Sequence, residues 1–281
     1  MHRSGLDVLG EEGSATLPPD PAVAVGDWLM MGAGGTVGPL PRRSLLTRRA
    51  PGRTPGLQTV AANLDTVFVT TSCNAEFNRA RLERALALVF AGGCAPVIVL
   101  TKPDLAPDPA PFLTEAAGIA PGVPARAVDA TGAGARAALE PWCGPGRTVG
   151  FMGSSGVGKS TLLNALAGRA LAETGAIRES DARGRHTTTR RELHLVAGGF
   201  SVIDTPGMRE LQLARAGDGI AAVFADIAAL SAGCRFRDCA HQGEPGCAVR
   251  GAVDPDRLSR WRKLIEEDAR NTEALGRRDR R

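Results

Sequence analysis

One stretch of the sequence decides the fold: Gly153-Ser154-Ser155-Gly156-Val157-Gly158-Lys159-Ser160. It matches the pattern G-x-x-x-x-G-K-[ST], in which glycines let backbone N–H groups point at phosphate oxygens and the lysine reaches the β and γ oxygens. An apolar segment, residues 147–152, precedes it, and a helical pattern, residues 160–167, follows it. Phosphate would then lie at a helix N-terminus, where the dipole favours an anion. The stretch, with Thr161 after it, predicts a phosphate-binding loop; the alternative is a glycine-rich turn that matches by chance.

A second motif, Thr101-Lys102-Pro103-Asp104, concerns the base of a nucleotide. It follows residues 95–100, an apolar run short enough for a central parallel strand. A carboxylate at Asp104 would accept hydrogen bonds from the N1–H and 2-amino groups of guanine, and adenine offers neither donor. The backbone N–H of Ala130 fits the remaining contact, with the base oxygen. Each of these signals is weak alone, but the second motif and the phosphate loop together favour a guanine nucleotide over the ATP of a P-loop kinase.

Two further segments predict how Mg²⁺ and the γ-phosphate are held. Asp204 ends the apolar run 200–203 and would hold the Mg²⁺ water shell, while the Gly207 N–H would meet the γ-phosphate. Within the stretch GRHTTT, residues 184–189, a threonine hydroxyl would reach Mg²⁺ beside that phosphate, and we favour Thr188. The predicted magnesium site therefore consists of Ser160, Thr188 and Asp204.

The residues around the γ-phosphate predict slow hydrolysis. Many GTPases place a glutamine after the glycine of the second switch to orient the attacking water, but this chain has Met208, which offers no donor or strong acceptor. His186 is the one imidazole near this chemistry, and we expect it to act in catalysis with Lys159 and Thr188. A surface histidine without a role is the alternative. We expect activation from another molecule.

A third group of residues predicts a metal site. Cys234, Cys239, His241 and Cys247 form the pattern C-x₄-C-x-H-x₅-C, which brings three thiolates and an imidazole into one loop. This donor set suits a closed tetrahedral Zn²⁺ site, and a closed site would be structural. A disulfide or free cysteines are the alternatives, and the absence of a signal sequence argues against the first. The remaining cysteines lie in or beside apolar segments and are expected to be core thiols: Cys73, Cys94 and Cys143.

The motifs occur in a rotated order, because base recognition precedes the phosphate loop and the switches follow it. In this order, and in several segments, the chain resembles the bacterial small-ribosomal-subunit biogenesis GTPases of the RsgA (YjeQ) type. The segments are VGDW at 25–28, PRRS at 41–44, QTVAANLD at 58–65, GRHTTT at 184–189, CRFRDCAH at 234–241 and EPGC at 244–247. The chain departs from the family at Thr101, where asparagine is more usual, and at Asp129, where serine is common.

The resemblance implies an α/β fold with three parts. These are an OB-like β-barrel over 1–57, a circularly permuted P-loop GTPase domain over 58–209 with a parallel sheet and helices on both faces, and a zinc-binding module over 210–281. Because family members have a longer stretch before residues 25–28, we expect either that the barrel lacks strands or that the start of the chain is misassigned. The resemblance further implies that the GTP form docks on the nearly mature small subunit, which stimulates hydrolysis and release. The rival hypothesis is an RNA-binding assembly factor whose nucleotide site is vestigial.

Composition agrees with a cytoplasmic globular protein, and the modest net charge says little by itself about nucleic acid. The chain has 281 residues, of which 43% are hydrophobic, and a formal charge of +4. It has neither an apolar run of membrane-spanning length nor a signal-like N-terminus, so we expect no membrane partner. We also expect a monomer. Arginines cluster near residues 42–53, beside the first switch and at residues 277–281. Such clusters would attract rRNA phosphates, although many surface arginines only aid solubility.

Overall fold

The computed structural model describes residues 5–11, 13–32, 35–50, 56–172, 192–204 and 211–279. Four of the residues singled out above lie outside these ranges: His186, Thr188, Gly207 and Met208. Their predicted roles therefore stay predictions. The phosphate loop, the base motif, Asp204 and all four predicted zinc ligands lie within the described ranges.

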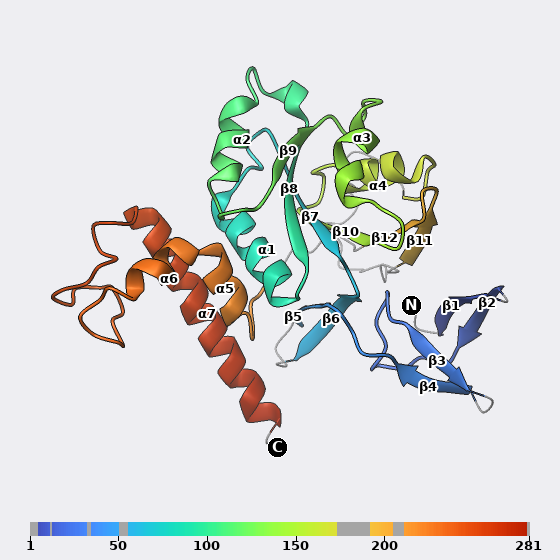
Figure 1. Cartoon of the computed structure of the whole chain (residues 1–281), viewed down its shortest axis with the longest axis horizontal. Coiled ribbons are helices and arrows are strands. Elements are labelled where there is room, and N and C mark those ends of the chain that lie inside the picture. The colour runs from blue at the N-terminus through green and yellow to red at the C-terminus, as the bar shows by residue number, and fades with distance from the viewer. Residues whose placement is uncertain are drawn as a thin grey trace, which may run out of the picture.

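The centre of the molecule is a six-stranded sheet with the order β11-β12-β10-β7-β8-β9 (Figure 1). Neighbouring strands are parallel, except that β11 and β12 form an antiparallel pair. The bounds of the strands are β7 (Thr66–Ser72), β8 (Ala95–Thr101), β9 (Ala125–Val128), β10 (Thr148–Gly153), β11 (Glu192–Val196) and β12 (Phe200–Asp204). The base motif, the phosphate loop and Asp204 therefore follow or end parallel strands at one edge of the sheet, as the motifs predicted.

Helices cover both faces of this sheet (Figure 1). On one face lie α1 (Arg79–Ala91) and α2 (Ala110–Ala117), and on the other lie α3 (Ala135–Leu139) and α4 (Lys159–Ala167). Short 3-10 helices span Pro103–Leu105 and Glu140–Trp142. Alternate residues of each strand enter opposite cores: Val67 and Val69 pack on the α1 side, whereas Phe68 packs on the α4 side. The period-two alternation of strand side chains thus builds two buried layers.

The N-terminal region consists of three antiparallel strand pairs. They are β1 (Leu6–Gly10) with β2 (Gly13–Leu17), β3 (Leu29–Gly32) with β4 (Gly35–Pro39), and β5 (Leu45–Arg49) with β6 (Leu57–Ala62). Within the described part of this region, no ladder of backbone hydrogen bonds joins one pair to another. The region is a small β unit, as expected, but its described strands are not closed into a barrel by backbone pairing.

The C-terminal region packs against α1 (Figure 1). It contains α5 (Gly217–Val223), α6 (Ala225–Ser231) and the long α7 (Pro255–Asp279). Ile220, Val223 and Leu264 belong to the same buried cluster as Leu86 of α1. A Cβ at Gly219 would lie 2.0 Å from the Ala87 carbonyl oxygen, so only glycine permits this approach of α5 to α1. In the described ranges we find no helix that is long and apolar enough to cross a membrane.

Candidate nucleotide site and metal centre

The phosphate loop connects the end of β10 to the start of α4. Three glycines in it have conformations that other residues rarely adopt: Gly153 has φ 156°, Gly156 has φ 78° and Gly158 has φ 93°. A Cβ at Gly153 would lie 2.2 Å from the carbonyl oxygen of Thr70 in β7. The loop therefore leaves the sheet in close contact with the neighbouring strand, and Ser160 and Thr161 stand in the first turn of α4, as predicted.

Lys159 and Asp204 place one cation and one anion at this edge of the sheet. The Lys159 ammonium donates to the Ser154 carbonyl oxygen at 2.5 Å, so the side chain lies along the loop. Burial lowers the pKa of Lys159 to about 8, although the Asp204 carboxylate opposes this shift. Burial likewise raises the pKa of Asp204, and His194 and Lys159 oppose that change. Each charge is thus poorly hydrated, which favours its interaction with phosphate or with a divalent cation.

The base motif is tied directly to the phosphate loop. Thr101, the last residue of β8, is fully buried, and its hydroxyl lies 2.6 Å from the Val157 carbonyl and 3.0 Å from the Thr71 carbonyl. It donates to one of them at a time. Lys102 has a left-handed backbone with φ 54°, and its ammonium donates to the Gly156 carbonyl at 2.7 Å. The threonine that replaces the family's usual asparagine therefore still bridges to the phosphate loop.

Asp104 and Ala130 occupy two loops beside that bridge. Asp104 is exposed in the 3-10 helix Pro103–Leu105. Ala130 follows β9, where Asp129 accepts hydrogen bonds from the Thr131 hydroxyl at 2.7 Å and the Thr131 N–H at 2.9 Å. These bonds lower the pKa of Asp129, so its carboxylate shapes the loop. A cavity of about 470 Å³ is lined by Ala130 and by Thr161, both of which were predicted nucleotide contacts.

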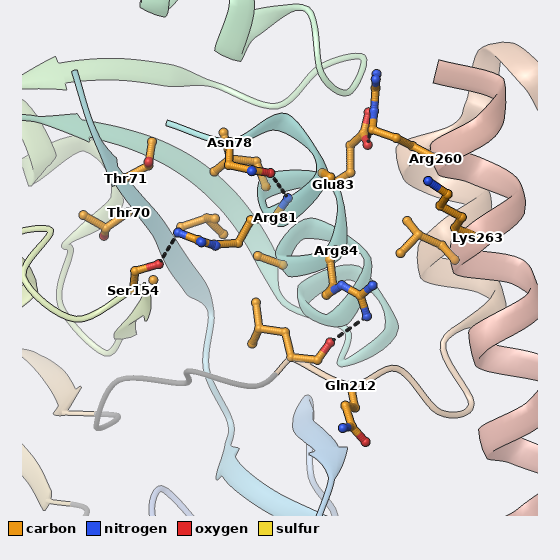
Figure 2. Close-up of a pocket in the computed structure, with 17 residues that line it drawn as sticks. Thr70, Thr71, Asn78, Arg81, Glu83, Arg84, Ser154, Gln212, Arg260 and Lys263 are labelled. Carbon is orange, nitrogen blue, oxygen red and sulfur yellow. Dashed lines mark hydrogen bonds and ion pairs between the residues drawn. The ribbon is translucent and has the colours of Figure 1, made fainter. Parts of the chain in front are cut away.

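Arg81 of α1 also reaches the phosphate loop, and motif analysis did not identify it. Its guanidinium donates to the Ser154 hydroxyl at 2.7 Å (Figure 2). The contact borders a cavity of about 360 Å³ between α1, the start of the phosphate loop, Leu211 and α7. Residues 81 and 154 are 73 positions apart, so no local pattern reveals the contact. The only available signal was an arginine in the first turn of a helix, where the dipole disfavours cations.

The predicted zinc ligands lie together. The ligand atoms of Cys234, Cys239, His241 and Cys247 all lie within 4.8 Å of one another. His241 directs Nδ1 at the thiols, 3.6 Å from the Cys234 sulfur and 3.4 Å from the Cys247 sulfur. No disulfide forms among the cysteines. Three thiols and one imidazole at this separation fit a tetrahedral Zn²⁺ ion with no open position.

Several other residues hold this ligand set in place, and sequence reasoning missed them. The Ser231 hydroxyl lies 3.1 Å from His241 Nε2, which would fix the ring with Nδ1 free to bind metal. The Trp261 ring lies 5.4 Å from the His241 ring, and the Arg262 guanidinium donates to the His241 carbonyl. Both side chains belong to α7, so the metal loop is docked on that helix.

Glu244 organises the loop from within. Its carboxylate accepts hydrogen bonds from the N–H groups of Ala240 at 2.8 Å, Gln242 at 2.8 Å and Gly243 at 3.0 Å. The bonds from the Gly243, Glu244, Ala240 and Gln242 backbone lower its pKa to about 2. In the sequence, the one sign of this role was a carboxylate between the histidine and the last cysteine of the metal motif. Its position is explained by the need to pair N–H groups that the tight loop leaves without partners.

Comparison with known proteins supports this arrangement. The family model described as RsgA GTPase matches residues 39–214. The small ribosomal subunit biogenesis GTPase RsgA of Mesorhizobium japonicum is 49% identical over 97% of this chain and 83% of its own length. RsgA 2 of Vibrio vulnificus is 44% identical over 96% of this chain and 80% of its own length.

Solved structures show the same fold. YjeQ from Thermotoga maritima has a TM-score of 0.58 at 25% identity, over 83% of this chain and 77% of that one. YloQ, described as a circularly permuted GTPase, has a TM-score of 0.62 at 23% identity, over 96% of this chain and 92% of that one. The permuted GTPase fold and the resemblance drawn from the motifs are confirmed. The chain belongs to the RsgA GTPase family.

Proposed function

We propose that this GTPase binds the small ribosomal subunit and hydrolyses GTP during late subunit maturation, as an assembly checkpoint. The relatives named above carry ribosome biogenesis in their names. The observation that carries the proposal is the tether between the base motif and the phosphate loop, formed by Thr101 and Lys102. The tether supports a site in which Asp104 would select guanine and Lys159 would neutralise phosphate charge.

We propose the following roles for the residues of the site. The backbone of residues 153–158 would cradle the phosphates, and Lys159 would contact the β and γ oxygens. Ser160, Thr188 and Asp204 would hold Mg²⁺, which neutralises charge developing on the transferred phosphoryl group. The Gly207 N–H would meet the γ-phosphate, and His186 would orient water. These four roles for Thr188, Gly207, His186 and Mg²⁺ follow from the sequence motifs and the chemistry of phosphoryl transfer.

We propose that hydrolysis is slow in the free protein and stimulated by the small subunit. Met208 occupies the position where many GTPases have the glutamine that orients water, so the water must be positioned by another group. Docking on the small subunit would position the attacking water. The protein would act in the cytoplasm as a monomer, with one structural Zn²⁺ that stabilises the loop of Cys234, Cys239, His241 and Cys247.

The proposed contact with rRNA rests on exposed arginines of the N-terminal region. Not all predicted arginines are available: Arg42 pairs with the buried Asp27 at 2.7 Å, and Arg49 donates to Gln212 at 2.7 Å. Arg43 pairs with Asp65 at 3.3 Å but keeps a side chain that is 64% exposed, and Trp28 is 70% exposed in the same region. An exposed indole and an exposed guanidinium in one region suit a nucleic-acid surface, since the indole can stack on a base while the cation meets phosphate.

The experiment that tests the proposal is GTP hydrolysis by the purified protein, alone and with small ribosomal subunits, beside ATP as a control. We expect slow turnover alone and strong stimulation by the subunits with GTP only. Turnover that small subunits leave unchanged would contradict the checkpoint function and favour an RNA-binding factor with a vestigial site. A preference for ATP would contradict the role of Asp104.

A further inference from the structure

The contact between Arg81 and Ser154 joins α1 to the phosphate loop (Figure 2). Arg81 Nη1 donates to the Ser154 hydroxyl at 2.7 Å, and Ser154 directly follows Gly153. The second partner of Arg81 is Glu76, at 3.4 Å, in an ion pair whose two side chains are 49% and 55% exposed. Because water screens an exposed ion pair, Glu76 offsets only part of the positive potential that the Arg81 guanidinium produces at the loop.

The position of this arginine is unfavourable for the helix itself. Asn78 caps α1 and accepts a hydrogen bond from the Arg81 N–H at 2.9 Å, so Arg81 lies in the first turn. The first turn holds two arginines and no acidic residue, although the dipole disfavours cations there. Arg79 pairs with Glu115 on α2 at 3.2 Å, in an ion pair about as exposed as that of Arg81 with Glu76. Arg81 differs from Arg79 in its contact with Ser154, through which its charge lies beside the phosphate loop at the positive end of α1.

The rest of α1 fixes where this charge lies. Glu83 is 1% exposed and pairs with Arg260 at 2.8 Å and Arg257 at 3.5 Å, both from α7. Arg84 pairs with Glu267 of α7 at 2.5 Å and donates to the Leu211 carbonyl at 3.0 Å. These contacts hold the helix, so the side chain of Arg81 extends to the phosphate loop from a fixed base.

We infer that Arg81 is a positioning residue for the phosphate loop, which holds the loop through Ser154 and adds positive charge beside the bound phosphates. The inference rests on the proposed nucleotide site, whose backbone N–H groups must be aligned before they can cradle phosphate. It identifies a nucleotide-affinity residue on the helix that also contacts the C-terminal region.

The test compares Arg81→Ala with Arg79→Ala, its matched control. The two arginines are two residues apart in the same helical turn, and their side chains are 49% and 46% exposed. Titration calorimetry with GDP and Mg²⁺ should show about tenfold weaker binding for Arg81→Ala. Arg79→Ala should match the unmodified protein. The melting temperature without nucleotide should stay unchanged for Arg81→Ala, since its side chain is half-exposed.

Two further variants separate positioning from a general structural effect. Ser154→Ala should weaken GDP binding, and adding Arg81→Ala to it should weaken binding by less than the product of the two single effects. Arg81→Lys keeps the charge but loses the planar fork, so we expect about threefold weaker binding. Additive effects, or equal affinities for Arg81→Ala and Arg79→Ala, would overturn the inference. Failure of the unmodified protein to bind GDP would instead contradict the proposed function.

Discussion

The phosphate loop and the zinc loop are both short polar turns, but different parts of the chain hold them in place. The phosphate loop depends on distant residues, since Thr70, Thr101 and Lys102 all contact it from other strands or loops. The zinc loop depends more on its own residues, because Glu244 pairs with three N–H groups within four positions, while Ser231, Trp261 and Arg262 hold His241 from outside the loop. The phosphate loop is shaped by the sheet around it, and the zinc loop is shaped chiefly by its own ligands and one carboxylate.

One charged side chain in each loop shows the same contrast. Burial lowers the pKa of Lys159 to about 8, so the folded protein disfavours this cation until phosphate is bound. Hydrogen bonds from the backbone lower the pKa of Glu244 to about 2, so the folded protein favours this anion. In the nucleotide region, the charge of Lys159 is stabilised only when a ligand binds. In the zinc loop, the charge of Glu244 is stabilised by the backbone of the loop itself.

Removal of a zinc ligand should have the largest effect and should leave the nucleotide region intact. In Cys239→Ser the metal loses one thiolate, and we expect loss of bound zinc and a free energy of unfolding lowered by about 4 kcal/mol. Zinc content and a thermal melt measure this. Cys94→Ala, which changes a buried thiol outside the cluster, should keep its zinc. If Cys239→Ser lost GDP affinity as well as zinc, the comparison would be contradicted, since the two loops would then depend on one another.

Asp104→Asn should weaken GTP binding at the nucleotide site while zinc stays bound. The asparagine side chain would place an N–H donor opposite the N–H donors of guanine, so GTP affinity should fall by at least about a hundredfold. Xanthosine triphosphate should bind better to this variant than to the unmodified protein, because its 2-oxo group accepts the amide N–H. Competition with a fluorescent GDP analogue measures both. Asp108→Asn, four residues further on, is the control and should bind GTP normally; unchanged GTP affinity in Asp104→Asn would remove it from base recognition.

The pH dependence of GDP binding sharpens the electrostatic part of the comparison. Lys159 is protonated below its pKa of about 8, so affinity should be constant there. Above that value binding must take up a proton, because phosphate raises the pKa of the bound ammonium, and affinity should fall by up to about tenfold per pH unit. Calorimetry between about pH 7 and 9 tests this. Lys159→Arg cannot deprotonate in this range and should lose the slope even if it binds weakly.

Glu244→Gln should have the smallest effect, confined to the zinc loop. The neutral amide accepts hydrogen bonds less strongly and cannot pair with all the N–H groups, so zinc affinity should fall by about tenfold. Competition with a chromogenic chelator measures it, with Glu266→Gln on the exposed side of α7 as the control. Equal zinc affinity in the two variants would mean that the four ligands alone define the loop.

The contrast also explains how much was predictable. The zinc ligands lie within fourteen residues, and the phosphate loop is a contiguous pattern, so local spacing identified both. The helix expected over residues 160–167 is α4, and the apolar runs at 95–100 and 200–203 are β8 and β12. Contacts such as Arg81 with Ser154, or Ser231 with His241, depend on which elements fold side by side, which no spacing encodes. The predicted switch residues outside the described ranges remain predictions.

The close packing of α5 on α1 at Gly219 bears on any attempt to divide this protein. A polypeptide ending after residue 209 would leave Leu82 and Leu86 of α1 without the apolar partners that α5 and α7 supply. Exposed leucines on a helix that also borders the nucleotide site invite self-association. Truncation would therefore yield an insoluble fragment in place of a minimal enzyme, and heating the whole chain should melt sheet and C-terminal helices together, in a single calorimetric peak.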